Sequence, residues 1–169
     1  MAGIVYDLLE ILKHQQECYE GLLTLATYKT ESVQNKNLEL LSQVVEKEEE
    51  FIGRLNLLDK KREGMLKDIA LVTGLKYEQL TLTKLMEKMG MELEVSQDLL
   101  QVRAEILELM EALKAQNEIN KMILEESLDY VGFTINAIKS TKMTQIPVNY
   151  GRPGEEETLQ TRSLFDKRQ

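Results

Sequence analysis

The side chains in this sequence best suited to catalysis or metal binding are its single histidine, His14, and its single cysteine, Cys18. They lie four residues apart and therefore share one face of a predicted helix. A cysteine nucleophile needs a histidine base that a third group orients, and no Asp, Glu or Asn is placed to do so. One histidine also excludes the histidine sets that build zinc and di-iron centres in helical bundles. No glycine-rich phosphate loop precedes a helix. We therefore expect neither an enzyme nor a bound metal or cofactor.

The composition is typical of a protein built from long helices. Of the 169 residues, 30% are charged and 5% are aromatic, and there are two prolines and no tryptophan. The net charge of -8 is concentrated in residues 1–140, which carry 16 Lys and Arg against 25 Asp and Glu. An acidic body argues against nucleic acid, because phosphates are bound by basic surfaces.

The same sequence predicts a cytoplasmic protein. The first residues, MAGIVYDLLEILKHQQ, have neither a basic segment nor a small-residue cleavage site, so we expect no signal peptide. No uncharged apolar run approaches the roughly 20 residues of a membrane span, so we expect no direct membrane insertion. A lone cysteine cannot form an internal disulfide, which favours a reducing compartment.

The spacing of apolar residues predicts an all-α fold, an antiparallel bundle or coiled coil of three long helices plus one short helix. The long helices are expected at residues 4–33, 38–72 and 91–140. The short helix is expected between an N-cap at Thr81 and a stop at Gly90, with its apolar residues covering one end of the core.

The domain boundary is expected after the third long helix. Residues 1–140 would form the bundle, and residues 141–169 a flexible tail, because prolines, glycines and polar residues there break any helix. The tail keeps a few apolar residues that could act as short docking motifs: Tyr150, Leu159, Leu164 and Phe165.

The second predicted helix carries apolar residues with a period of 3.5 over more than four heptads. Such a strict period predicts a supercoiled pairing with a neighbouring helix. Glu48 and Arg62 are polar positions in this seam, a placement that commonly fixes register. The expected seam consists of Leu41, Val45, Glu48, Ile52, Leu55, Leu58, Arg62, Met65, Ile69 and Val72.

Residues 117–138 of the third predicted helix differ from an ordinary amphipathic helix because their apolar residues fall on two opposite faces. One stripe contains Leu113, Leu124, Leu128, Val131, Ile135 and Ile138, together with the polar residues Asn117, Asn120 and Ser127, which are expected to fix register. The second contains Ile119, Met122, Tyr130, Phe133 and Ala137, interrupted by Glu126. One stripe is enough to dock the helix. The other must be covered by another helix of the chain, by a second copy of the chain, or by a partner protein.

Several segments together resemble the FlgN family of flagellar export chaperones. The most informative is Asn117-x-x-Asn120-x-x-x-Leu124-x-x-Ser127-Leu128-x-Tyr130, which is similar to the family's C-terminal signature. Glu49-Glu50-Phe51-x-x-x-Leu55 is close to its second-helix motif, with the apolar order altered. The segment Thr81-Leu82-Thr83-Lys84-Leu85 precedes the long third helix, as in the family, and Tyr150-Gly151 follows that helix by some ten residues.

The resemblance implies a binding function in the cytoplasm. FlgN-like proteins bind the terminal regions of hook-associated proteins (FlgK and FlgL type), keep them from assembling early, and present them to the export gate protein FlhA. Carried over to this sequence, Tyr150 and Gly151 would dock on the cytoplasmic domain of FlhA. The client surface would consist of Ile119, Met122, Ile123, Glu126, Tyr130, Phe133 and Ala137.

Two alternatives to this function stay open at the level of sequence. The chain could be a structural coiled coil that uses its second stripe to form a homodimer or a larger homo-oligomer. It could also be an export chaperone for a different flagellar client, such as the filament cap or flagellin.

Overall fold

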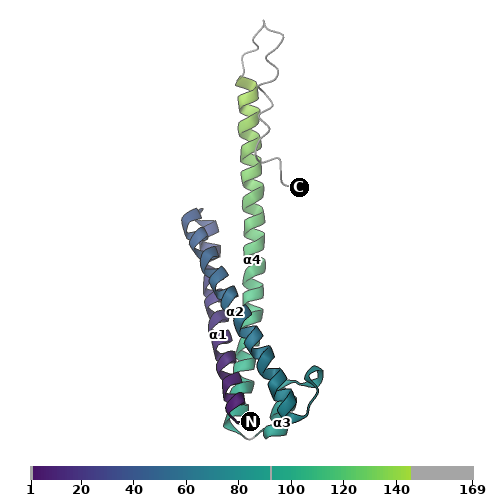
Figure 1. The fold of residues 1–169 in the computed structure, drawn as a ribbon. Helices are drawn as coiled ribbons and strands as arrows, with labels where there is room; N and C mark the ends of the chain where they lie inside the picture. The colour runs from purple at the N-terminus through teal and green to yellow at the C-terminus, as the bar shows by residue number, and fades with distance from the viewer. Residues whose placement is uncertain (1, 92, 146–169) are drawn as a thin grey trace, which may run out of the picture. The chain divides into compact units, whose positions relative to one another are not determined.

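The computed structural model describes the backbone of residues 2–91 and 93–145, and within these ranges it contains helices and no strands (Figure 1). The all-α fold that the periodicity predicts is therefore confirmed. The expected end of the third long helix at residue 140 is wrong, because the helix continues to Gln145 and includes the first five residues of the proposed tail. The rest of that tail, including Tyr150 and Gly151, lies outside the described residues. The elements are α1 (Ala2–Gln34), α2 (Leu38–Thr73), the 3-10 turn η1 (Tyr77–Gln79), α3 (Leu82–Met89) and α4 (Glu94–Gln145).

The helix ends follow from local side-chain and backbone chemistry. Asn37 caps α2 by accepting a hydrogen bond from the Leu40 amide at 3.0 Å, and Thr81 caps α3 in the same way. Gly74 ends α2 in the left-handed conformation, with φ of 68°, which glycine adopts without strain. The expected N-cap at Thr81 is confirmed.

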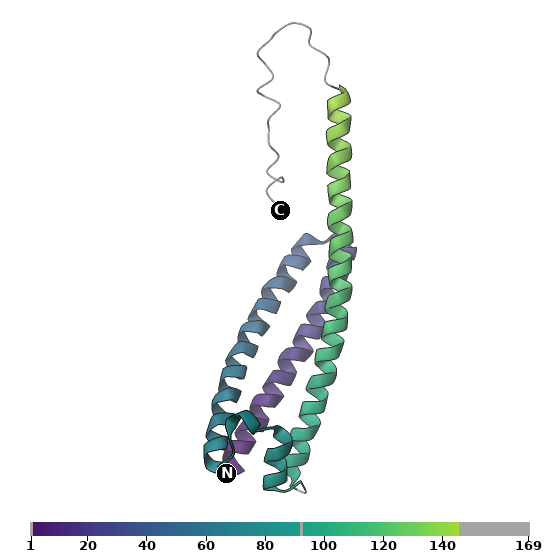
Figure 2. The ribbon, with the colours of Figure 1, turned by 90° about the vertical axis from the view of Figure 1, so that its right-hand side faces the viewer.

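The chain divides into two units, residues 1–128 and residues 129–169. In the first unit, α1 and α2 are antiparallel, because Gln15 pairs with Asp59 and Lys29 pairs with Glu48. The 94–128 part of α4 runs parallel to α1, since Gln16 pairs with Glu105 and, farther along both helices, Ala26 pairs with Asn120. Figure 2 shows α1 lying between α2 and this part of α4. The first unit is thus an up-down-up bundle of three long helices with α3 at one end.

Two apolar clusters hold the first unit together. The larger lies near the N-terminus of α1 and includes Leu85 and Met86 of α3, which are fully buried, so the short helix covers the end of the core as expected. The smaller is centred on Cys18, Leu22 and Leu55. The larger cluster consists of Val5, Leu8, Leu9, Leu12, Ile69, Leu85, Met86, Val95, Leu99 and Val102.

The seam of α2 differs from the prediction in part. Val45, Ile52 and Val72 are exposed, whereas Val44 is only 3% exposed and Phe51 is half-buried. The predicted and observed seams share Leu41, Glu48 and the positions from Leu55 to Ile69, and they differ in using Val45 or Val44 and Ile52 or Phe51. The packing of α1 against α2 selects the one that turns Val44 inward. The buried or half-buried seam consists of Leu41, Val44, Glu48, Phe51, Leu55, Leu58, Arg62, Met65 and Ile69.

Candidate protein-binding surface

The residues expected to bind a partner lie on α4, four in the first unit and three in the second. In the first unit, Ile119, Met122 and Glu126 are exposed and Ile123 is half-buried. No described helix therefore covers Ile119 or Met122, although both are apolar. Coverage of these positions by another helix of the bundle, the first of the three sequence alternatives, is not seen among the described residues.

The second unit is described from Asp129 to Gln145 and continues the helix. Tyr130, Phe133 and Ala137 are all exposed there, and Phe133 is 72% exposed. Val131 and Ile138, which the sequence assigns to the docking stripe instead, are also exposed. We call Tyr130, Val131, Phe133, Ala137 and Ile138 the distal surface.

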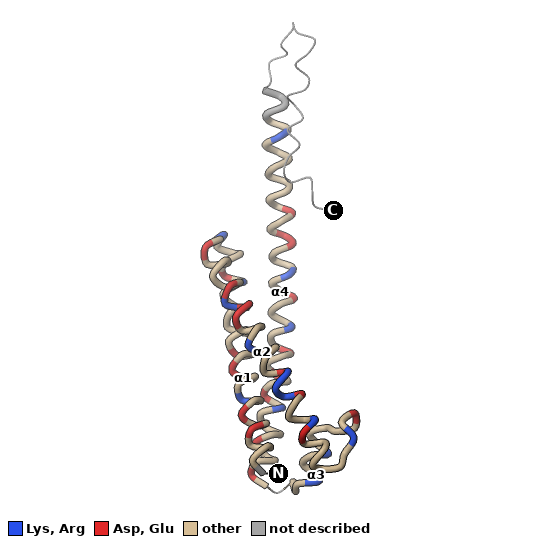
Figure 3. Tube along the Cα trace, in the orientation of Figure 1, with Lys and Arg blue, Asp and Glu red and all other residues tan. Residues whose placement is uncertain are grey.

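The distal surface is uncharged as well as apolar. Between Asp129 and Lys139 the helix carries no Lys, Arg, Asp or Glu, and Figure 3 shows this run as an uninterrupted neutral stretch of α4. A partner that covers this run does not have to remove water from an ionised group, which would cost several kcal/mol if the charge stayed unpaired. Exposed apolar residues concentrated in this way mark interaction sites more often than isolated exposed residues do.

The residues expected to set register differ in their surroundings. Asn120 is buried, and its amide donates to the Ala26 carbonyl oxygen at 2.8 Å and accepts from the Thr30 hydroxyl. Gln116 donates to the same hydroxyl at 2.7 Å. Asn117, by contrast, is exposed. Asn120 therefore fixes the alignment of α4 on α1, because any shift would leave a buried amide without partners.

The remaining polar seam residues make local contacts or bridge α1 and α2. Glu48 forms an ion pair with Lys29 at 2.5 Å, with both side chains largely buried. Arg62 pairs with Asp59 one turn earlier on the same helix. Ser127 donates to the Ile123 carbonyl oxygen within α4.

The two residues suited to chemistry are not brought together. His14 is exposed, with its ring nitrogens 3.8 Å from Glu10 and 3.3 Å from Glu17, so the prediction that no acidic side chain is placed to orient this histidine is wrong. Cys18 is fully buried, and this burial raises the pKa of its thiol above the ordinary value, an effect that the nearby Arg54 charge opposes. Cys18 is thus a core residue of the smaller apolar cluster.

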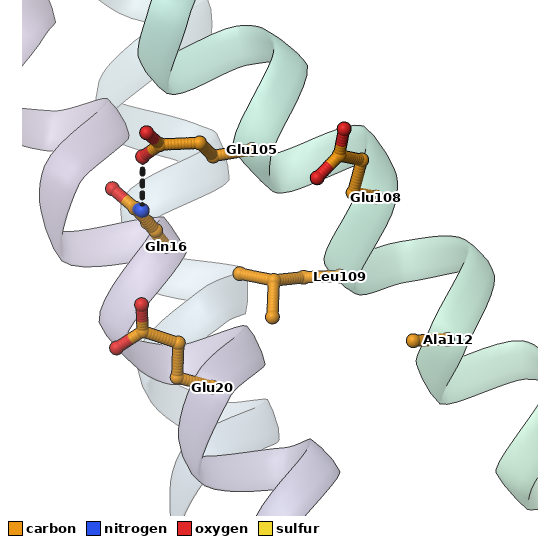
Figure 4. Close-up of a pocket in the computed structure, with 6 residues that line it drawn as sticks. All are labelled: Gln16, Glu20, Glu105, Glu108, Leu109 and Ala112. Carbon is orange, nitrogen blue, oxygen red and sulfur yellow. Dashed lines mark hydrogen bonds between the residues drawn. The ribbon is translucent and has the colours of Figure 1, made fainter.

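An open groove of about 510 Å³ lies between α1 and α4 in the first unit (Figure 4). Its walls carry the carboxylates of Glu20, Glu105 and Glu108, and Gln16 donates to Glu105 at 2.6 Å across it. Leu109 lies between these groups. The groove is therefore an acidic surface that disfavours anionic ligands. Among the described residues, no cluster of three or more acidic, cysteine or histidine side chains could hold a metal ion.

The structure thus describes an all-helical protein whose distinguishing feature is an exposed apolar helix face. The family model for the FlgN protein matches residues 1–158, which is nearly the whole chain. The chain belongs to the FlgN family of flagellar export chaperones. No curated protein and no solved structure matches it. None of the described helices is both long and apolar enough to cross a membrane.

Proposed function

We propose that this flagellar export chaperone binds the terminal regions of hook-associated proteins of the FlgK and FlgL type through the distal surface. In this role it acts in the cytoplasm, keeps those regions from assembling, and delivers the client to the export gate. Family membership supports the class of client. The observation that carries the choice of surface is the exposure of Phe133 within an uncharged apolar helical run.

The distal surface fits an amphipathic helix of the client. Tyr130, Phe133 and Ala137 are spaced by three and four residues, so they lie along one line of the helix. Aromatic side chains that become fully desolvated at the centre of an interface are typical anchors. Binding would cover an apolar face on each partner, which is what an assembly-prone client requires.

Export-gate delivery is proposed on the resemblance of the tail. Tyr150 and Gly151 match the position of the family's docking motif and lie outside the described residues. We propose that they contact the cytoplasmic domain of FlhA, leaving the distal surface occupied by the client.

Calorimetric titration of the full chain with the C-terminal segment of its hook-associated protein tests the client surface. We expect one-to-one binding at micromolar Kd or tighter, lost in Phe133→Asp. Asn56→Asp is the matched control, since it adds the same charge at an exposed polar position of α2, outside the distal surface, and it should bind as the unsubstituted protein does.

Other outcomes of the titration separate the alternatives. Binding of a filament-cap or flagellin segment in preference to the hook-associated segment would reassign the client. A chain that sediments as a stable dimer and binds none of these segments would be a structural homo-oligomer, and the proposed function would be wrong.

A further inference from the structure

A second apolar face is exposed on α2, in the first unit. Leu38, Val45 and Ile52 recur every seven residues, so they share one line along the helix. Val45 is 40% exposed, Ile52 is 49% exposed and Leu38 is more exposed still. We call these three residues the α2 stripe. It adjoins the buried seam of α2, and its periodicity is that of a helix–helix interface.

The stripe lies on a flank of α2 next to the buried seam, and no described helix covers it. The two apolar clusters of the described residues reach Phe51 on α2 and Leu113 on α4, and no farther toward the α1–α2 connection. Beyond Leu113, α4 is fixed to α1 by the hydrogen bonds of Gln116 and Asn120. Among the described residues, no apolar cluster joins the hairpin end of α2 to α4, and one apolar flank of α2 is exposed there.

Acidic side chains without partners border the stripe. Glu49 lies four residues after Val45 and three before Ile52, so it neighbours both. Glu39 and Glu46 directly follow Leu38 and Val45, so they lie about a quarter turn farther round the helix. Glu39, Glu46 and Glu49 make no ion pair or hydrogen bond with any described residue, whereas Glu48 and Glu50 are paired with lysines. An apolar line bordered by unneutralised carboxylates is complementary to a helix with an apolar line bordered by lysines or arginines.

We propose that the α2 stripe binds a cationic amphipathic helix of a partner protein, which adds a fourth helix to the hairpin end of the bundle. The apolar residues of that helix pack on Val45 and Ile52, and its basic residues pair with Glu49. A second copy of this chain does not fit, because two α2 stripes facing each other bring their carboxylates together. The stripe uses none of the residues of the distal surface, so the inference holds independently of the proposed function.

The test is fluorescence anisotropy of the full chain with a labelled helical peptide of about 20 residues. The probe carries Leu at every a and d position and Lys at the flanking positions, and a matched peptide carries Glu in place of Lys. We expect the lysine peptide to bind at least about tenfold more tightly than the glutamate peptide. Raising the salt concentration should weaken the binding.

Variants of exposed residues locate the site without disturbing the core. Val45→Gln and Ile52→Gln should each lower the affinity for the lysine peptide by about fivefold or more. Glu49→Gln should lower that affinity and also reduce its dependence on salt concentration. Leu71→Gln is the matched control, because Leu71 is an apolar residue of α2 that is 82% exposed and lies outside the stripe. Circular dichroism confirms that each variant keeps its helix content.

Three results would overturn the inference. One is unchanged peptide affinity in both Val45→Gln and Ile52→Gln. Another is an equal loss in Leu71→Gln, which would mean nonspecific adsorption to exposed apolar residues. The third is a chain ending at residue 145 that binds the peptide about tenfold more tightly than the full chain, which would identify the chain's own basic terminus, RSLFDKRQ, as the occupant.

Discussion

Truncating Phe133 to Ala should weaken client binding strongly while leaving the free energy of unfolding almost unchanged. The side chain is 72% exposed, so a partner can cover roughly 145 Å² of a ring whose full burial removes about 200 Å² from water. At about 25 cal/mol per Å² this sets an upper limit near 3.6 kcal/mol. Ordering of side chains at the interface reduces it, so we expect Phe133→Ala to cost about 2–3 kcal/mol of client binding, or about 30- to 150-fold in Kd.

The same substitution should leave the fold almost unchanged. Because Phe133 contributes little buried area, the free energy of unfolding in urea should change by less than about 0.5 kcal/mol. Leu99→Ala, at a fully buried core position, should do the reverse, lowering stability by about 2–5 kcal/mol while the folded protein keeps its client affinity. A Phe133→Ala variant that unfolds readily, or that binds the client with unchanged Kd, would refute the assignment of the distal surface.

Further predictions concern the tail, the packing of α1 on α2, and the buried thiol. Tyr150→Ala should leave the client affinity measured by calorimetry unchanged but weaken binding to the cytoplasmic domain of FlhA in a pull-down or titration. Unchanged affinity for FlhA would show that Tyr150 is not part of the docking motif. Gly21→Ala should lower the free energy of unfolding by about 1 kcal/mol, because a Cβ there would lie 2.6 Å from the Phe51 ring. Gly53→Ala, with open space around its Cβ, should raise the free energy of unfolding by about 0.5–1 kcal/mol, and a reversed order in urea melts would contradict the packing. Burial raises the pKa of Cys18 above 9.0, so the folded state holds its proton longer than the unfolded state, and stability should fall as pH rises above 9.0. A Cys18→Ala variant should lose that part of the pH dependence in chemical denaturation, and an identical slope would show that other groups cause it.

The number and type of helices could be predicted from the sequence because their signals are local. Thr81 as an N-cap and Gly74 as a helix stop each act through the backbone of their own segment. The burial of Leu85 and Met86 followed from the apolar face of a short helix, which has only the end of the bundle to cover.

The register of α2 could not be predicted in the same way. Val44 and Val45 are adjacent valines, and each fits a period of 3.5 with the positions that follow. The choice between them depends on the surface of α1, where the missing side chain of Gly21 leaves room for the Phe51 ring and so favours the register that contains Val44 and Phe51. The spacing of apolar residues along α2 does not contain that information. The hydrogen bonds of Gln116 and Asn120 to α1 could not be predicted either, since their partners lie 86 and 94 residues earlier in the sequence.

The exposure of the apolar residues of α4 was likewise predicted only in part. The exposure of Phe133 and Met122 agrees with a second stripe that the bundle does not need. Helical periodicity assigned Val131 and Ile138 to the stripe that docks on the bundle, but both are exposed. Periodicity shows which residues share a face of the helix and does not show whether a neighbouring helix covers that face. Apolar periodicity identifies faces that can be buried, and only the packing decides which of them are.

Hydrogen–deuterium exchange of the full chain, with and without the terminal segment of its hook-associated protein, tests the central claim most directly. We predict that client binding slows exchange of the backbone amides in residues 129–141, where the helix carries the distal surface, and that Phe133→Asp removes this protection. Protection confined to other segments, with exchange in residues 129–141 unchanged, would contradict the account.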